Sequence, residues 1–308
     1  MIAYSYQFIL STDISINYME NTLLYSIIGA IIAIICVVLF AFIPFINRAC
    51  VFRPYVADDS EMDALQNYYG KKIIRTSFPT KDGITLHGML INTTREPSWN
   101  DLIFLYSHGN GGWIGALMES STIKLLSKYG SVFVYDYRGY GLSNGTPSEE
   151  GLYTDITTAW NWLTVKKLIP HNRIIIFGHS LGASVSSYLV SKIINQSKNL
   201  PRALILEAPF VTMQQVADEL MPTISFLLMY KFNNVSHLLN INGKIPVYIL
   251  HSRDDKVIPY HHSNTLKDVC FSNNQLDKNS DLIEIGGSHN VPNYNNDVRV
   301  LLDRLSSN

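Results

Sequence analysis

The apolar and polar positions divide this chain into a long apolar N-terminal segment and a larger part in which short apolar runs alternate with helix-like patterns. No charged residue occurs from Asn21 to Asn47, and residues 23–46 are almost wholly apolar. About 20 such residues suffice to span a bilayer. A buried helix of this length in a soluble protein would show a polar stripe, and this one does not. We therefore predict a transmembrane helix over residues 23–46, preceded by a short N-terminal segment over residues 1–22.

The flanks of this segment favour a permanent anchor over a cleaved signal peptide. Residues 1–22 contain no Lys or Arg, whereas a signal peptide needs a basic n-region and a shorter apolar core. Arg48 and Arg53 follow the apolar run, while Asp13 and Glu20 precede it. Positive charge concentrates on the cytosolic side of membrane helices. This weak bias predicts that the C-terminal part faces the cytosol.

Beyond the apolar segment, we expect a juxtamembrane linker over residues 47–70 and one α/β domain over residues 71–308. Its expected strands cover residues 72–78, 84–91, 101–107, 131–137, 173–177, 203–207, 245–251 and 282–285. Helix-like patterns separate several of them, at residues 114–128, 148–168 and 181–195. This alternation predicts a mostly parallel sheet that is flanked by helices on both faces.

Residues 211–240 interrupt the alternation. They connect two predicted strands, yet they are long and contain the apolar stretch 221–230. An ordinary packed helix would account for them, but long crossovers with extra apolar surface often serve as lids. We predict a small helical cap over the active site at about residues 211–240.

Composition and charge narrow the classes of partner. The 308 residues carry a formal net charge of -1, with 16% charged and 47% hydrophobic residues. Neutrality argues against nucleic acid, which is bound by basic surfaces. The three cysteines, Cys36, Cys50 and Cys270, are far apart in the sequence, so neither a disulfide framework nor a Cys-based metal site is implied. We expect no metal and no cofactor.

A Gly-x-Ser-x-Gly motif lies between a predicted strand and a predicted helix. Residues 178–182 are GHSLG, directly after the β-branched run 173–177 and before the helix-like residues 183–190. This context is that of a nucleophile elbow, in which the serine occupies a sharp, strained turn. Side chains at the two glycine positions would collide with the neighbouring strand and helix. The motif predicts Ser180 as a nucleophile.

An activated serine needs a base and an orienting carboxylate, which follow it in the chain in this kind of fold. The predicted strand 245–251 is followed by Asp254 and Asp255, and both qualify as the acid on placement alone. The last predicted strand is followed by residues 286–290, GGSHN, in which His289 can reach the serine. We predict His289 as the base. None of the other histidines follows a strand in the required order.

Two backbone N–H groups are expected to form an oxyanion hole. One belongs to Leu181, the residue after the predicted nucleophile. The other should come from the first strand–helix loop, residues 107–112, SHGNGG, whose glycines let the backbone approach a substrate carbonyl. We expect Asn110 to supply this second donor through its backbone rather than its side chain.

Four further motifs are residues 135–143 (YDYRGYGLS), 145–151 (GTPSEEG), 204–210 (LILEAPF) and 251–259 (HSRDDKVIP). They resemble the motifs of membrane-anchored serine hydrolases of the ABHD type. The resemblance is strongest to the branch of lysophosphatidylserine and monoacylglycerol lipases, and it covers about residues 70–305. It implies the α/β-hydrolase fold, selects Asp255 over Asp254 as the acid, and implies an active site in the endoplasmic reticulum lumen, contrary to the arginine bias.

These features together predict a membrane-anchored serine hydrolase that cleaves carboxylic esters of lipids through Ser180, His289 and Asp255. Its partners would be a lipid ester and the bilayer, through residues 23–46, with a single-pass location in the endoplasmic reticulum membrane. One alternative is a thioesterase that removes acyl groups from proteins, since the chemistry is the same. Another is a non-catalytic membrane protein on a hydrolase fold.

Overall fold

The computed structural model describes residues 2–196, 199–271 and 280–307, and it divides into the units Met1–Ala49 and Cys50–Asn308. Helix α1 (Ile2–Val51) accounts for the first unit. Within the described residues, Asn21–Val51 is the one helical segment that is long and apolar enough to cross a membrane. It contains the predicted span 23–46, and the helix also continues through the residues that precede this span.

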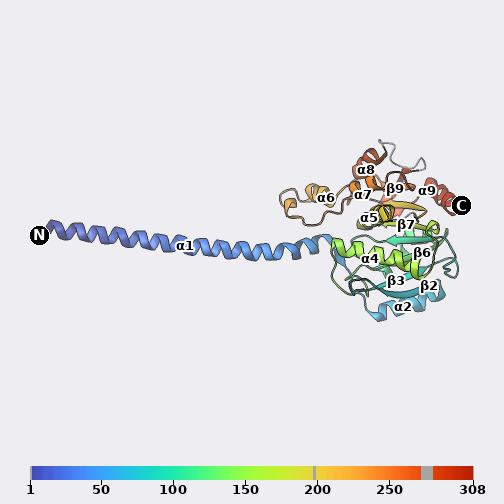
Figure 1. The fold of residues 1–308 in the computed structure, drawn as a ribbon, viewed down its shortest axis with the longest axis horizontal. Helices are drawn as coiled ribbons and strands as arrows, with labels where there is room; N and C mark the ends of the chain where they lie inside the picture. Colours follow the sequence, from blue (N-terminus) through green and yellow to red (C-terminus); the bar gives the residue numbers. More distant parts are fainter. Residues whose placement is uncertain (1, 197–198, 272–279, 308) are drawn as a thin grey trace. The chain divides into compact units, whose positions relative to one another are not determined.

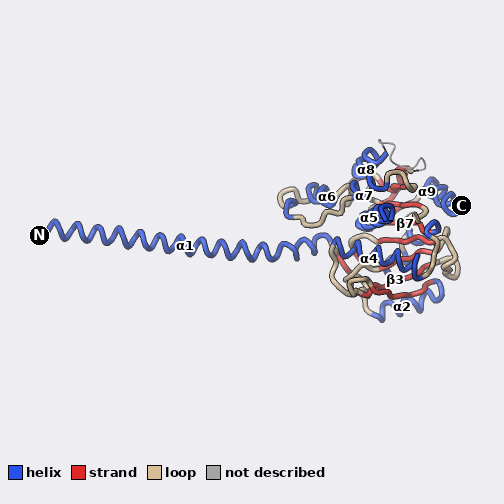
Figure 2. Tube along the Cα trace, in the orientation of Figure 1, coloured by secondary structure: helices blue, strands red, loops and turns tan. Residues whose placement is uncertain are grey.

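A nine-stranded sheet forms the centre of the second unit (Figure 2). The spatial order is β11 (Val291–Asn293), β10 (Asp281–Ser288), β9 (Val247–Ser252), β8 (Ala203–Glu207), β7 (Ile174–His179), β4 (Ile103–Ser107), β6 (Ser131–Tyr135), β3 (Thr85–Ile91) and β2 (Ile73–Pro79). The strands from β10 to β6 in this order run parallel, and β11, β3 and β2 are antiparallel to their neighbours.

Helices cover both faces of this sheet (Figure 1). Alternate residues of β7 show the two layers, because Ile174 and Ile176 belong to one apolar cluster and Ile175 and Phe177 to the other. This burial on both faces explains why the central strands are continuous apolar runs. The helices are α2 (Asp59–Tyr69), α3 (Ser121–Leu126), α4 (Glu149–Asn161), α5 (Leu181–Gln196), α6 (Met213–Leu220), α7 (Asn234–Ile241), α8 (His261–Phe271) and α9 (Asn296–Ser306). The predicted α/β class is confirmed.

Several boundaries differ from those expected. The predicted helix 114–128 is a 3-10 segment, Ile114–Glu119, followed by α3, because the Ser120 side chain accepts a hydrogen bond from Ile123 N and caps a new helix. The predicted helix 148–168 is α4, which ends at Asn161 and continues as a π-helical turn, Trp162–Lys166. These differences in helix boundaries do not affect the order of the strands in the sheet.

The segment that we expected to be a linker, residues 47–70, has secondary structure of its own. Strand β1 (Arg53–Pro54) pairs in parallel with β5 (Gly111–Gly112). Helix α2 follows and begins with a capping box, in which the Asp58 side chain accepts from Glu61 N and the Glu61 side chain accepts from Asp58 N.

The insertion between β8 and β9 is helical, as predicted. It contains α6, a 3-10 turn (Ser225–Leu227) and α7. Helix α7 packs against α5 and α8 and buries Leu238 and Ile241, while α6 stands away from the sheet in Figure 1.

Candidate active site

Ser180 lies on the sharp turn between β7 and α5. Its φ of 53° is in the left-handed region, which costs energy for any residue with a Cβ. The turn is held by Ser180 N, which donates to Glu207 O at 2.9 Å. A Cβ on Gly178 would lie 2.2 Å from Gly182 O, and one on Gly182 would lie 2.1 Å from Ser107 O. The steric role predicted for the two glycines is therefore confirmed.

The structure brings Ser180, His289 and Asp255 together. Each follows a parallel strand, β7, β10 and β9 respectively, at the same edge of the sheet. His289 Nε2 lies 3.1 Å from Ser180 Oγ, and His289 Nδ1 lies 2.7 Å from Asp255 Oδ2. All three side chains are at most 8% exposed. The arrangement can draw the serine proton onto the imidazole and stabilise the resulting imidazolium.

Asp255 is also held by the backbone. Its Oδ1 accepts from Val257 N at 2.8 Å and from Ile258 N at 2.9 Å. Burial by itself would raise the pKa of this carboxyl, but the hydrogen bonds from His251 and His289 outweigh burial and lower the pKa below its usual range. The carboxyl is therefore an anion at neutral pH, as a partner of an imidazolium must be.

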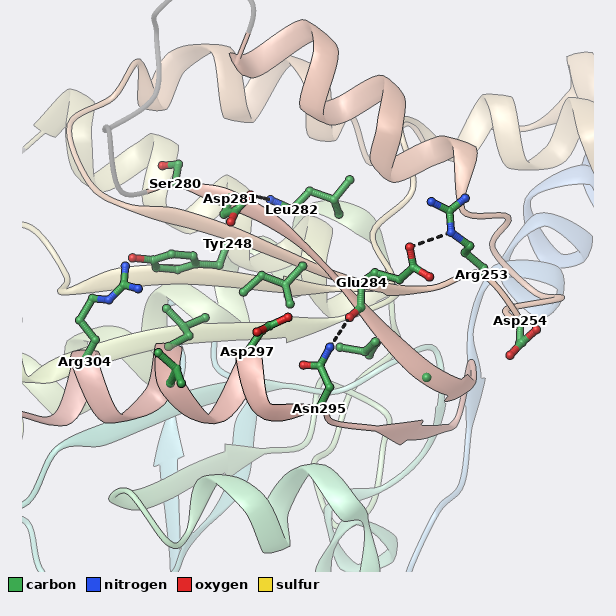
Figure 3. Close-up of a pocket in the computed structure, with 15 residues that line it drawn as sticks. Tyr248, Arg253, Asp254, Ser280, Asp281, Leu282, Glu284, Asn295, Asp297 and Arg304 are labelled. Atoms are coloured by element: carbon green, nitrogen blue, oxygen red, sulfur yellow. Dashed lines mark hydrogen bonds and ion pairs between the residues drawn. The ribbon is translucent and has the colours of Figure 1, made fainter.

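The neighbouring Asp254 does not reach His289 in this arrangement. It is exposed and lines a separate cavity of about 740 Å³ beside β10 and α9, which shares no lining residue with the cavity at Ser180. Figure 3 shows this second cavity, in which two lining residues, Arg253 and Glu284, form an ion pair at 2.7 Å. The geometry thus separates two carboxylates that their order along the chain left equivalent.

His251 is a neighbour of the site that the sequence did not identify. Its Nε2 donates to Ile258 O at 2.9 Å and lies 3.3 Å from Asp255 Oδ2, while its Nδ1 lies 2.6 Å from Ser263 Oγ. Because a carbonyl only accepts, the ring proton is on Nε2 and faces the carboxylate. The signal available in the sequence was its position at the end of a strand, four residues before Asp255.

His179 and Glu207 form a second buried group beside Ser180. His179 Nε2 donates to His289 O at 2.9 Å, and Glu207 Oε2 accepts from Tyr294 Oη at 2.5 Å. Burial lowers the pKa of His179 to about 3 and raises that of Glu207 to about 7. His179 therefore stays neutral, and its hydrogen bond fixes the backbone of His289.

A cavity of about 430 Å³ opens beside Ser180. Its walls include His289, Arg53 and the loop of residues 108–111. Asn110 lies in this loop, and Leu181 is the first residue of α5, whose first N–H groups have no acceptor within the helix. Among the described residues, none that lines this cavity belongs to 211–240, so the covering role of that insertion stays a prediction.

One group of side chains has the composition of a metal site. Within the described part of the chain, it consists of Glu219 from α6 with His261 and His262 from α8. His262 Nδ1 accepts from Val211 N at 3.2 Å, so its proton is on Nε2, which lies 3.2 Å from Glu219 Oε2. A metal-binding histidine instead donates through its second nitrogen. This geometry favours a hydrogen-bonded contact between α6 and α8.

Comparisons with known proteins agree with this architecture. A family described as serine aminopeptidase, S33, matches residues 98–244. Protein R595 of Acanthamoeba polyphaga mimivirus is 31% identical over 69% of this chain and 74% of its own length. The lysophosphatidylserine lipase ABHD12 of Mus musculus is 33% identical over 56% of this chain and 46% of its own length. The uncharacterized protein YfhR of Escherichia coli K12 is 30% identical over 61% of this chain.

The chain thus spans 65% of YfhR and about half of the mouse lipase. Among solved structures, an alpha-beta hydrolase from Vibrio vulnificus has a TM-score of 0.66 at 18% identity, covering 80% of this chain and 87% of that one. This likeness supports the fold. The strand order, the elbow at Ser180 and these relatives lead to one conclusion: the chain belongs to the α/β-hydrolases, and its residues 98–244 match the serine aminopeptidase S33 family.

Proposed function

We propose that this protein is a membrane-anchored serine hydrolase that cleaves carboxylic esters of lipids, with a lysophospholipid or a monoacylglycerol as substrate. The observation that carries the proposal is the chain of hydrogen bonds from Ser180 through His289 to Asp255. The likeness to a lysophosphatidylserine lipase supports a lipid ester over other acyl compounds. The apolar segment Asn21–Val51 supports a substrate that resides in the bilayer.

In this mechanism Ser180 Oγ attacks the ester carbonyl while His289 Nε2 takes its proton. The Asn110 and Leu181 N–H groups stabilise the oxyanion of the tetrahedral intermediate. His289 then protonates the leaving alcohol as the C–O bond breaks, which leaves an acyl-serine. Water, deprotonated by His289, attacks the acyl group and releases the fatty acid and the free serine. Asp255 keeps the imidazole in the required tautomer throughout.

Membrane anchoring is a separate part of the proposal. We place the anchor at residues 23–46 and the protein in the endoplasmic reticulum membrane as a single-pass protein. Washing membranes with alkaline carbonate tests the anchor. Retention of the full chain in the membrane pellet is expected, and its release into the supernatant would contradict an integral anchor.

The substrate class is tested by reconstituting the purified full chain in liposomes with three candidates: a lysophospholipid, a monoacylglycerol and an acyl-cysteine peptide. Release of fatty acid is followed for the wild type and for Ser180→Ala. We expect Ser180-dependent hydrolysis of one of the two lipid esters. If Ser180-dependent cleavage is confined to the thioester, the function is that of a protein thioesterase and not of a lipase.

A further inference from the structure

Residues 51–57, which we call the strap, run against the loop that contains Asn110. Arg53 N donates to Asn110 O at 2.9 Å, and Tyr55 N donates to Gly112 O at 3.2 Å. In a third hydrogen bond, the Asn110 side chain donates from Nδ2 to Val51 O at 3.2 Å. The strap therefore holds the loop through both main-chain and side-chain atoms of the predicted oxyanion donor.

The other edge of the strap is also paired. Gly141 N donates to Tyr55 O at 2.7 Å, and Ala57 N donates to Gly141 O at 3.1 Å. The ring of Tyr55 stacks on Trp113, with centroids 6.1 Å apart. The strap thus fills the space between two loops, one after β4 and one after β6, and joins them as a strand would.

These contacts fix the orientation of the peptide groups around Asn110. Its carbonyl oxygen accepts from Tyr140 Oη at 2.9 Å in addition to Arg53 N, so both of its lone pairs are used. The preceding residue, Gly109, lies against the nucleophile, since a Cβ there would be 3.8 Å from Ser180 Cβ. Arg53 itself lines the cavity at Ser180. A shift of the strap would therefore move the loop at the reacting atoms.

We propose that the strap is a positioning element of the active site, whose Arg53 backbone N–H and Val51 carbonyl hold Asn110 so that its own N–H faces the oxyanion. The inference rests on the proposed hydrolase function. Oxyanion stabilisation depends on donors that are already oriented before the reaction, because reorientation in the transition state costs energy. The strap begins at Val51, the last residue of the apolar segment Asn21–Val51. The residues at the end of this segment and just after it therefore complete the catalytic centre.

The test removes one hydrogen-bond donor of the strap, the backbone N–H of Arg53. Arg53→Pro removes the N–H that bonds to Asn110 O, whereas Arg53→Ala keeps it and removes only the guanidinium. Val56→Pro is the matched control, because it places proline in the same strap at an exposed residue whose N–H makes none of the bonds described above. Turnover of a soluble short-chain ester by the detergent-solubilised full chain gives kcat and KM. Affinity for a trifluoromethyl ketone, which forms a tetrahedral adduct, reports on the oxyanion hole.

For Arg53→Pro we expect kcat to fall by about tenfold or more and inhibitor affinity to fall in parallel, with KM changed by less than about threefold. Val56→Pro should retain kcat. Arg53→Ala is the reference for Arg53→Pro, because both variants lack the guanidinium that lines the cavity. Arg53→Pro should have the lower kcat of the two, because it also lacks the N–H that bonds to Asn110 O. Asn110→Ala keeps the backbone N–H but loses the bond to Val51 O, and it should also lower kcat. This variant tests the proposal if Arg53→Pro does not fold.

Unchanged kcat and inhibitor affinity in a folded Arg53→Pro enzyme, or in Asn110→Ala, would overturn the role of the strap and leave the hydrolase intact. An equal loss of kcat in Val56→Pro would also overturn it, because general disruption would then explain the effect. A wild type that neither turns over esters nor binds the inhibitor would instead contradict the proposed function itself.

Discussion

At the scale of residues, Asp255 Oδ2 determines which nitrogen of His289 is free to take the Ser180 proton. It accepts from Nδ1 at 2.7 Å, so the ring proton is on Nδ1 and Nε2 presents its lone pair to Ser180 Oγ. Val257 N and Ile258 N hold the other carboxylate oxygen, and His251 lies against Oδ2. Four groups, two main-chain N–H groups and two histidine side chains, thus hold the carboxylate of Asp255, the predicted acid.

Replacing Asp255 by Asn should therefore cost far more activity than replacing Asp254. The Asn amide can donate to Nδ1 and so favours the tautomer whose Nε2 carries the proton, which lowers kcat by about 10⁴-fold. Asp254→Asn alters an exposed side chain and should change kcat by less than about twofold. Steady-state hydrolysis of a soluble ester measures both. The opposite ranking would show that Asp254 is the acid.

At the scale of elements, the turn from β7 to α5 depends on close approach of backbones. A Cβ on Gly182 would be 2.1 Å from Ser107 O, a main-chain atom in the last residue of the central strand β4, which is held between β7 and β6. Gly182→Ala should therefore destabilise the fold by about 1–3 kcal/mol and displace Ser180.

Gly286→Ala provides the matched control, because the nearest atom to its Cβ would be Asn293 Cβ at 3.6 Å, an ordinary contact. Urea denaturation of the two variants measures the difference. Equal stability of Gly182→Ala and the wild type would mean that the turn is looser than the structure shows.

The same elements show what could be predicted from the sequence. The strand–turn–helix around Ser180 carries a strong local pattern, and the ends of β7 and α5 were predicted within two residues. The acid was narrowed to two residues, which differ only in the direction of their side chains. The strap was missed because its bonds to residues 110–112 join main-chain atoms of segments more than 50 positions apart, and such pairing leaves no side-chain pattern.

At the scale of the whole molecule, a buried carboxyl couples stability to pH. Asp136 is fully buried, and its Oδ1 accepts from Ile114 N at 2.9 Å while Oδ2 has no hydrogen-bond partner among the described residues. Burial raises the pKa of this carboxyl to about 8. The folded protein therefore keeps it protonated, and the associated stability is present below the ordinary pKa near 3.8 and lost as the pH rises through about 8.

Asp136→Asn should remove this dependence, since the amide stays neutral. Between pH 6 and pH 9 the melting temperature of the wild type should fall more than that of the variant. Glu207, whose pKa is raised in the same way, contributes equally to both proteins, so the difference isolates Asp136. Parallel melting curves across this pH range would show that Asp136 is ionised in the folded state throughout.

The central claim is that this fold assembles an activated serine, and covalent labelling by a fluorophosphonate tests it most directly. The probe reacts with a serine whose proton is taken by a base, and it needs no knowledge of the natural lipid. The full chain in detergent is compared with Ser180→Ala. We predict strong labelling of the wild type and none of the variant. A folded wild type that stays unlabelled, or equal labelling of both proteins, would contradict Ser180 as the nucleophile.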